Sequence, residues 1–349
     1  MNLCRTRQRL VVPVIGVVIS ALLAACGGQD SDTTVTPATE EQARPWTFTD
    51  DRGIEISLDS RPQRIVAFET AGSALWHLGI RPVGIFGGAP LTEDNPSLFG
   101  VDLAGIESVG EVYGEINLEK LAALRPDLIV TAFDPRQAGP VFGFADQGMQ
   151  EKVEAIAPIV ALDGTKDPTV VIGRFEELAQ SLGADLQMSE LVADRQRFDE
   201  AMEELRLAVA GKPGLRAVAM YPTPAEGISF ARPAQFPGLR QLQQAGLQLV
   251  EPGGDAGDVN EDFVTFFYES ASWEQADKYP ADLILVHSSL GSSDLDALAE
   301  IATWRALPAV EAGQVVAWRG AENWSYLAYA QDLELITEAV KSANPDLVS

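Results

Sequence analysis

Short apolar runs alternate with segments whose apolar positions recur every three or four residues, from Pro45 to the end of the chain. Runs such as "RIVAF" (64–68) and "DLIVTA" (127–132) are typical of strands, and the segments between them are typical of amphipathic helices. The alternation predicts an α/β fold in which central sheets are flanked by helices. An earlier segment, "WTFTDDRGIEISL" (46–58), predicts a small hairpin with its turn at Asp51-Arg52-Gly53. The other elements predicted in the first half are helices over 71–79, 117–125 and 146–156, and strands over 82–86 and 159–163.

A repeat at an interval of 155 residues divides this pattern into two halves. The segment "NLEKLAALRPDLIV" begins at Asn117, and "SWEQADKYPADLIL" begins at Ser272. Each starts with a polar residue suited to a helix N-cap, followed by a glutamate and, eight residues later, by Asp-Leu-Ile. Three more pairs of similar segments occur, and all four pairs have the same order in the two halves. They are "QRIVAF" with "LRAVAM", "HLGIRPVG" with "QAGLQLVE", and "IVALD" with "VVAWR". Four such pairs predict two lobes that are built alike.

The residues between the two halves, 168–212, contain helix-forming sequence without a strand signal. Within them, 184–210 has neither Gly nor Pro, and its apolar residues include a series with the spacing of a helix. A helix of that length spans about 40 Å. We therefore expect a first lobe over 45–167, a helical linker over 168–212 with one long helix, and a second lobe over 213–349.

The first 25 residues have the features of an export signal. Three arginines precede an apolar segment over 11–23, which would span about 20 Å as a helix and is too short to cross a bilayer. Small residues then lead to Cys26 in the sequence "LAAC", which resembles the lipobox of bacterial lipoproteins. That resemblance implies cleavage before Cys26 and a lipid on its sulfur. Residues 26–44 are polar and predict a flexible tether that follows this anchor.

Composition and missing motifs exclude several classes of function. After removal of the three signal arginines, 22 Lys and Arg stand against 51 Asp and Glu, a net charge of −29, which argues against binding to nucleic acid. Only two histidines are present, His77 and His287, too few for a protein that captures bare zinc or manganese. The motifs of serine hydrolases, zinc proteases and P-loop enzymes are missing, so we expect no enzyme, no cofactor and no resident metal.

Ligands of α/β lobes lie beyond the carboxyl ends of the strands, and this rule selects the candidate binding residues. Aromatic side chains at these ends can enclose a bound ligand, and arginine is suited to donate charge-assisted hydrogen bonds to it. His287 ends a predicted strand and could also contact the ligand. The candidates are Phe68, Tyr113 and Arg136 in the first lobe, and Tyr221, Phe230, Arg232, Trp318, Arg319, Trp324 and Tyr326 in the second.

Five sequence blocks between Arg61 and Leu335 carry a resemblance to a known family: "RPQRIVAF…LGIRPVGIFG", "VGEVYGEINLEKLAALRPDLIV", "YPADLILV", "LPAVEAGQVVAW" and "SYLAY". The chain resembles the substrate-binding lipoproteins of bacterial ABC importers for ferric siderophores and cobalamin. The resemblance implies two lobes joined by one rigid helix, with a ligand cleft between them and little closure on binding. It also implies a monomer, lipid-anchored outside the cytoplasm, that delivers a ferric siderophore to a membrane permease. Glu119 and Glu274 match the glutamates that dock such proteins to the permease.

The class of ligand stays open at this point. The acidic chain has few lysines, and its candidate site combines two or three arginines with many aromatic residues, which favours a ferric hydroxamate over a strongly anionic catecholate. Cobalamin and haem are alternatives within the same family. A cell-envelope hydrolase and a structural or signalling lipoprotein are the alternatives outside it.

Overall fold

The computed structural model describes residues 44–287, 292–318 and 323–348, and Gln42–Ser349 forms one compact unit. The predicted signal peptide, Cys26, nearly all of the tether and Arg319 lie outside the described residues. None of the described helices is both long and apolar enough to cross a membrane.

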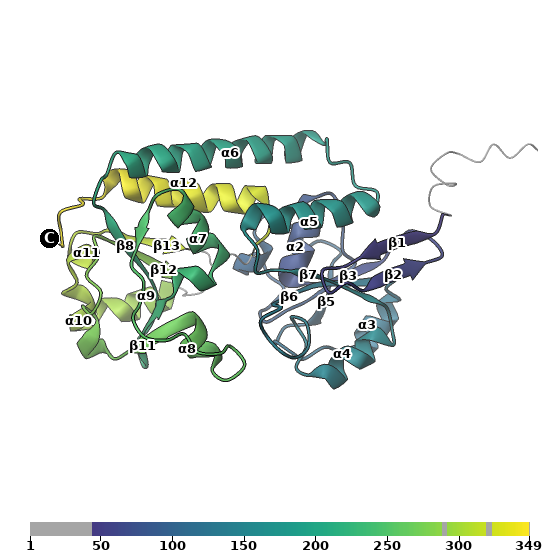
Figure 1. Ribbon diagram of the computed structural model, residues 1–349. Helices are drawn as coiled ribbons and strands as arrows, with labels where there is room; N and C mark the ends of the chain where they lie inside the picture. Colours follow the sequence, from purple (N-terminus) through teal and green to yellow (C-terminus); the bar gives the residue numbers. More distant parts are fainter. Residues whose placement is uncertain (1–43, 288–291, 319–322, 349) are drawn as a thin grey trace, which may run out of the picture. The chain divides into compact units, whose positions relative to one another are not determined.

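The first lobe is built on a five-stranded parallel sheet with the order β5-β4-β3-β6-β7 (Figure 1). The predicted hairpin is confirmed, since β1 and β2 pair antiparallel and Gly53 lies in the turn with φ of 79°. The strands are β1 (Trp46–Thr49), β2 (Glu55–Leu58), β3 (Ile65–Phe68), β4 (Gly84–Phe86), β5 (Glu107–Gly110), β6 (Leu128–Phe133) and β7 (Ile159–Asp163). The helices are α2 (Glu69–His77), η1 (Pro96–Leu98), α3 (Leu118–Leu124), α4 (Gln147–Glu154) and α5 (Pro168–Ser181).

The second lobe is built on a six-stranded sheet with the order β11-β9-β8-β12-β13, in which β10 also pairs with β8. Strands β10, β8, β12 and β13 are parallel, and β9 runs antiparallel to β8 and β11. The strands are β8 (Arg216–Thr223), β9 (Gly227–Ala231), β10 (Gln248–Leu249), β11 (Tyr268–Ala271), β12 (Leu283–His287) and β13 (Val315–Trp318). The helices are η2 (Pro233–Gln235), α7 (Pro237–Gln244), α8 (Phe263–Phe267), η3 (Trp273–Gln275), α9 (Ser292–Ala299), α10 (Ala302–Arg305), α11 (Pro308–Glu311) and α12 (Tyr326–Ser342).

The internal repeat is present in three dimensions. The series β4-β3-β6-β7 of the first sheet corresponds to β10-β8-β12-β13 of the second. At corresponding positions, the Asp127 carboxylate accepts hydrogen bonds from the backbone N–H groups of Gln63 and Arg64, and that of Asp282 accepts one from Arg216. The repeated Asp-Leu-Ile motif therefore holds the first strand of each lobe beside its parallel neighbour.

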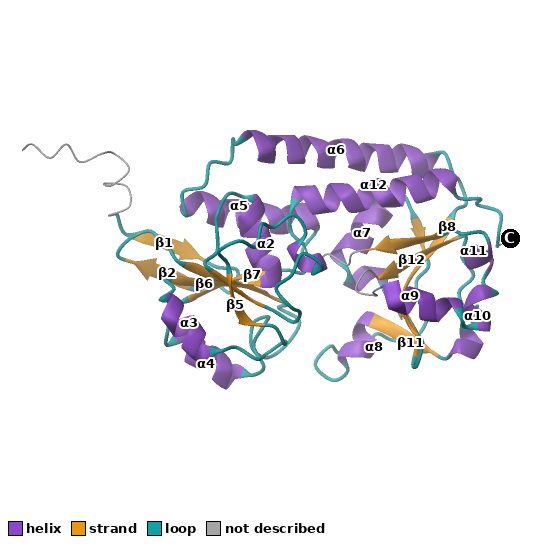
Figure 2. Cartoon of the chain, turned by 180° about the vertical axis from the view of Figure 1, so that it is seen from behind, coloured by secondary structure: helices purple, strands orange, loops and turns teal. Residues whose placement is uncertain are grey.

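The linker contains helix α5, which packs on β1, β7 and α2 of the first lobe and on α7 of the second, followed by the long helix α6 (Ser189–Ala210). The long helix expected within 184–210 is therefore present, and it begins at Ser189. The C-terminal helix α12 lies beside α6 in both views, along most of its length, and α6 extends beyond it on the side of the first lobe (Figures 1 and 2). A continuous apolar cluster runs from α2 and α5 through α6 and α12 to α7. The spine between the lobes is thus a pair of helices, of which the sequence revealed one.

Candidate functional site

The carboxyl ends of β3, β6 and β7 in the first lobe, and of β8, β12 and β13 in the second, lead into the loops that hold most candidate residues. Parallel pairing places the carboxyl ends of these strands at the same edge of the sheet in each lobe. Hydrogen bonds between loops of the two lobes, described below, show that these edges face each other. The site is therefore built from both lobes.

An aromatic wall stands at the end of β3. Phe68 is buried and packs against Phe86, Phe142 and Tyr113, with ring centroids 5.8, 6.5 and 6.2 Å away. Tyr113 meets Phe68 edge to face and is itself 54% exposed. Tyr113 thus offers an accessible ring to a ligand, whereas Phe68 supports that ring from behind.

A buried carboxyl group lies beside this wall. Glu69 begins α2 directly after Phe68, and its side chain accepts hydrogen bonds from the Asn95 amide (3.0 Å) and the Gly88 backbone N–H (3.2 Å). Burial raises the pKa of Glu69, and the two hydrogen bonds oppose that rise in part. Glu69 fixes the loop after β4, and no sequence motif marks it as a residue of the site.

Arg136 contacts the second lobe at the site. Its guanidinium donates from Nε and Nη2 to the two oxygens of Asp134 (2.9 and 2.8 Å) and from Nη1 to Gln235 Oε1 of the second lobe (2.8 Å). The group also lies 5.1 and 5.5 Å from the ring centroids of Phe266 and Phe267. The predicted arginine is therefore placed between the lobes, held by a carboxylate of its own lobe.

Asn260, in the segment between β10 and α8, adds a second contact from the other lobe to the loop of Arg136. Its side-chain amide accepts from the backbone N–H of Ala138 (2.5 Å) and donates to the backbone carbonyl of Arg136 (3.0 Å). Asp258 accepts from the same amide and holds it in place. Sequence reasoning missed Asn260, because an asparagine in a loop has no periodic pattern.

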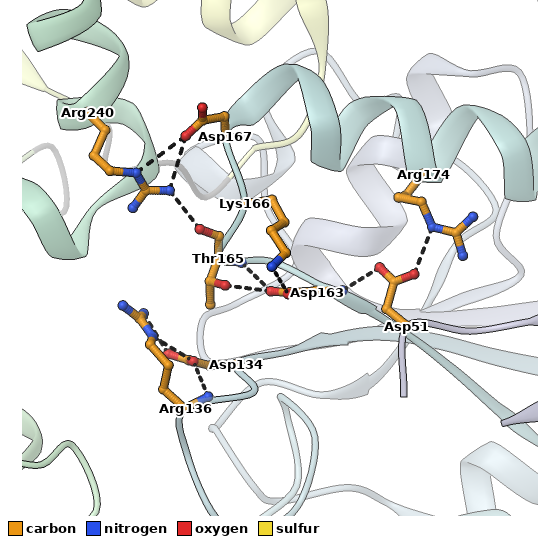
Figure 3. Close-up of polar contacts among 9 residues, drawn as sticks. All are labelled: Asp51, Asp134, Arg136, Asp163, Thr165, Lys166, Asp167, Arg174 and Arg240. Atoms are coloured by element: carbon orange, nitrogen blue, oxygen red, sulfur yellow. Dashed lines mark hydrogen bonds and ion pairs between the residues drawn. The ribbon is translucent and has the colours of Figure 1, made fainter. Parts of the chain in front are cut away.

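Three cations beyond the strand ends, each paired with an acid, form what we call the paired-charge cluster (Figure 3). Its pairs are Arg136 with Asp134, Lys166 with Asp163, and Arg240 of the second lobe with Asp167. Arg240 also donates to the Thr165 carbonyl (2.7 Å), so this cluster contributes a further link between lobes.

The second-lobe wall is formed by rings at the ends of β8, β12 and β13. His287 lies edge to face with both Tyr221 (5.8 Å) and Trp318 (5.1 Å), and Trp318 in turn contacts Phe236 (5.2 Å). Burial lowers the pKa of His287 to about 4, so its ring is neutral near pH 7. Tyr221 is partly exposed, whereas Trp318 is only 2% exposed and acts in this structure as a support for its neighbours.

Two candidates of the second lobe belong to its interior. Phe230 is 0% exposed and packs edge to face on Tyr279 within the core, because its position in β9 directs the ring to the covered face of the sheet. Arg232 is 7% exposed and donates to the carbonyls of Thr265, Pro252 and Gly254. Phe230 therefore has no surface for a ligand, and Arg232 fastens the loop that leads to α8.

Two others lie on the spine side. Trp324 is buried and stacks on Phe175 of α5, with ring centroids 5.4 Å apart. Tyr326 packs edge to face on Phe198 of α6, and the Arg195 guanidinium lies 5.7 Å from its ring centroid. Burial, with the nearby Glu176 carboxylate, raises the pKa of Tyr326. Trp324 thus packs the segment before α12 against α5, and Tyr326 packs the start of α12 against α6, so neither is part of the proposed ligand site.

The two glutamates matched to permease docking are exposed at helix starts. Glu119 lies in the first turn of α3, whose N-cap Asn117 accepts from the Lys120 backbone N–H. Glu274 lies in the 3₁₀ turn η3, shorter than the α-helix suggested by the repeat. A groove of about 640 Å³ between the end of β5 and the start of α3 includes Glu115, Asn117 and Lys120 in its lining. Across the described part of the chain, no group of three or more His, Cys, Asp or Glu could hold a metal ion.

Comparisons with known proteins agree with this architecture. The family model for the periplasmic binding protein matches residues 95–321. The chain is 24% identical to the Fe(3+)-citrate-binding protein YfmC of Bacillus subtilis (strain 168) over 319 residues, covering 89% of this chain and 90% of that protein. It is 25% identical to the iron(3+)-hydroxamate-binding protein YxeB of the same organism over 202 residues, covering 57% of this chain and 54% of that protein.

Among solved structures, the chain is similar to DesE, a ferric-siderophore receptor protein from Streptomyces coelicolor. The two are 32% identical with a TM-score of 0.76, and the match covers 86% of this chain and 99% of that one.

Proposed function

The chain belongs to the periplasmic binding protein family, and from that membership we propose that it captures a ferric siderophore outside the cytoplasm and delivers it to the permease of an ABC importer. The observation that carries the proposal is the contact of Arg136 with Gln235, Phe266 and Phe267, because it sets a hydrogen-bonding and aromatic surface between the lobes. An iron chelate needs a site of this kind, since its own oxygens already hold the metal. The proposed function is therefore that of a binding protein, without catalysis.

The proposed ligand is a neutral or cationic ferric hydroxamate. Each cation of the paired-charge cluster already has an acid beside it, and His287 is neutral, so the described part of the site offers little net positive charge to a catecholate. YxeB is named for a ferric hydroxamate, whereas YfmC is named for ferric citrate, an anionic alternative. The site residues of this proposal are Tyr113, Arg136 and Tyr221, with Phe68 and Trp318 behind them, and Arg319 as a proposed member from outside the described residues.

Anchoring and docking complete the proposal. A lipid on Cys26 would hold the protein at the outer face of the cell membrane, with residues up to 44 as the tether. Glu119 and Glu274 would bind basic side chains of the permease, since both carboxylates are exposed and begin a helical turn.

Tryptophan fluorescence of the purified full chain tests the binding function. The titrants are ferrioxamine B, ferrichrome, ferric citrate, a ferric tris-catecholate, haemin and cobalamin, each ferric chelate being matched by its iron-free chelator. We expect saturable quenching with a Kd below about 1 µM for a ferric hydroxamate, and much weaker binding of its iron-free form. Absorption by the ligands is corrected against free tryptophan. If no ferric chelate binds, the proposed function is wrong; if haemin or cobalamin alone binds, the family assignment stands with a different ligand.

A further inference from the structure

Asp134 is a buried carboxylate whose bonds all serve to hold Arg136 and its loop. It is 4% exposed, and it accepts from Arg136 Nε and Nη2, from the Arg136 backbone N–H (2.9 Å) and from Gln137 Nε2 (3.1 Å). Burial works to raise the pKa of Asp134, but the bonds from Arg136 and Gln137 outweigh it and hold that pKa below its usual value. Asp134 is therefore ionised near pH 7.

The Asp134–Arg136 ion pair places one negative and one positive charge side by side at the boundary between the lobes (Figure 3). The Arg136 side chain is 31% exposed, and it reaches Gln235 and the rings of α8, whereas the Asp134 side chain is 2% exposed. A ligand between the lobes would thus approach the guanidinium with the carboxylate behind it. In such a setting the field of Arg136 is largely cancelled by Asp134.

We propose that Asp134 determines the charge class of the chelate that this site accepts, by neutralising Arg136 and so excluding anionic chelates in favour of neutral or cationic ones. The inference rests on the proposed function, since it concerns the selectivity of the same site. Selectivity is the difference between the affinities for two ligands. A carboxylate that weakens binding of the wrong ligand therefore raises selectivity as effectively as a contact that strengthens binding of the right one. Without that carboxylate, a half-buried guanidinium would be free to attract an anion.

The test is the ratio of the dissociation constants for two chelates of opposite charge. Ferrioxamine B is a cationic ferric trihydroxamate and ferric enterobactin is an anionic tris-catecholate; both saturate the iron. In the full chain, Asp134→Asn is expected to change this ratio by about tenfold or more in favour of the anionic chelate. The double variant Asp134→Asn/Arg136→Gln is expected to return the ratio to within about twofold of the wild type. The guanidinium that Asp134 neutralises is then absent as well, so neither charge of the pair remains.

A matched control exists in the hairpin of the first lobe. Asp50 is 3% exposed and, like Asp134, holds the arginine two residues later, with Arg52 Nε at 2.7 Å from Oδ2. Asp50→Asn removes a buried carboxylate of the same kind at a different place, so it should leave the ratio unchanged. If Asp134→Asn fails to fold, Arg136→Gln alone decides the matter: the ratio should then move in the opposite direction, because Asp134 is left uncompensated.

The outcomes separate this inference from the proposed function. A wild-type protein that binds a ferric chelate, with a ratio that Asp134→Asn or Arg136→Gln leaves unchanged, overturns the role of Asp134 alone. A ratio that Asp50→Asn changes as much as Asp134→Asn would show a general effect of lost charge and would also overturn it. A wild-type protein that binds no ferric chelate of the titration series overturns both proposals.

Discussion

His287 shows how the environment of one residue fixes its chemistry. The imidazole lies between the rings of Tyr221 and Trp318, and burial lowers its pKa to about 4. The side chain is therefore a neutral part of the second-lobe wall in the range where most bacteria grow. Its tautomer, and not its charge, decides what it can donate or accept.

The lowered pKa of His287 predicts a pH dependence of stability. The unfolded chain takes up a proton near pH 6.5 and the folded chain only near pH 4, so stability is complete above about pH 6.5 and falls as the pH drops to 4. The loss due to this one group is on the order of 3 kcal/mol across that window. Urea denaturation of the wild type and His287→Gln at several pH values measures it. An equal pH slope in both proteins would contradict the prediction.

Tyr113 and Phe230 are two aromatic candidates with opposite expected roles. Tyr113→Ala should weaken binding of a ferric chelate by about tenfold with little change in stability, because the exposed ring has few native contacts to lose. Phe230→Ala should lower the free energy of unfolding by about 3–5 kcal/mol, since it leaves a cavity in the core. Titration and urea denaturation of both variants check the pair. A loss of stability in Tyr113→Ala as large as in Phe230→Ala would contradict the assignment.

At the level of elements, the repeated aspartate makes more bonds in one lobe than in the other. Asp282 is 0% exposed, and besides the Arg216 N–H it accepts bonds from the backbone N–H groups of Leu347 and Val348 near the end of the chain. Asp127 is partly exposed and, among the residues that the structure describes, accepts from the backbone N–H groups of Gln63 and Arg64. The same motif therefore fastens one strand in the first lobe, and a strand plus the C-terminal segment in the second.

This difference predicts unequal costs of removal. Asp282→Ala should destabilise the protein by about 3 kcal/mol or more, because it leaves three buried or partly buried N–H groups without their acceptor, and Asp127→Ala by only about 1–2 kcal/mol. Thermal and urea denaturation measure both variants against the wild type. Equal losses would mean that the contacts of the C-terminal segment add nothing to stability.

The elements that the sequence predicted well are those with a local signal. Strands such as β6 and β12 are apolar runs introduced by Asp, and the repeat made the two-lobe plan visible from the amino-acid pattern alone. The partnership of α12 with α6, and the contact of Asn260 with Ala138 across 122 residues of sequence, depend on how distant segments pack and leave no periodic trace. Phe230 and Tyr326 were predicted to contact the ligand, but Phe230 lies in the core and Tyr326 packs on α6. The reason is related, since nearness to a strand end does not fix the direction of a side chain.

At the scale of the whole molecule, the lobes are joined by the spine and by loops at the site. The spine comprises α6 and α12, with Trp324 stacked on Phe175 and the Ser73 hydroxyl bonded to Asn323. At the site, Arg136 and Asn260 bridge loops of the two lobes. Two packed helices resist bending more than one, so the expectation of a small closure on binding stays a prediction, and solution scattering with and without ligand measures it.

The proposed docking to a permease uses one exposed glutamate of each lobe. Glu119→Arg and Glu274→Arg should each lower permease-dependent uptake of the iron chelate by tenfold or so, with unchanged chelate affinity, because both residues lie in exposed helical turns outside the site. Glu115→Arg and Glu261→Arg are exposed controls in the same lobes. Uptake of radioactive iron by cells that carry each variant is the measurement. Equal uptake in the docking and control variants would contradict the role of Glu119 and Glu274.

The most direct test of the central claim is the position of the iron in a crystal of the protein grown with a ferric hydroxamate. Anomalous scattering at the iron absorption edge locates the metal without reference to the rest of the map. We expect one iron peak between the lobes, beyond the carboxyl ends of β3 and β6 on one side and of β8, β12 and β13 on the other. An iron peak on the outer surface of either lobe would contradict this expectation, and so would crystals in which the protein binds no iron.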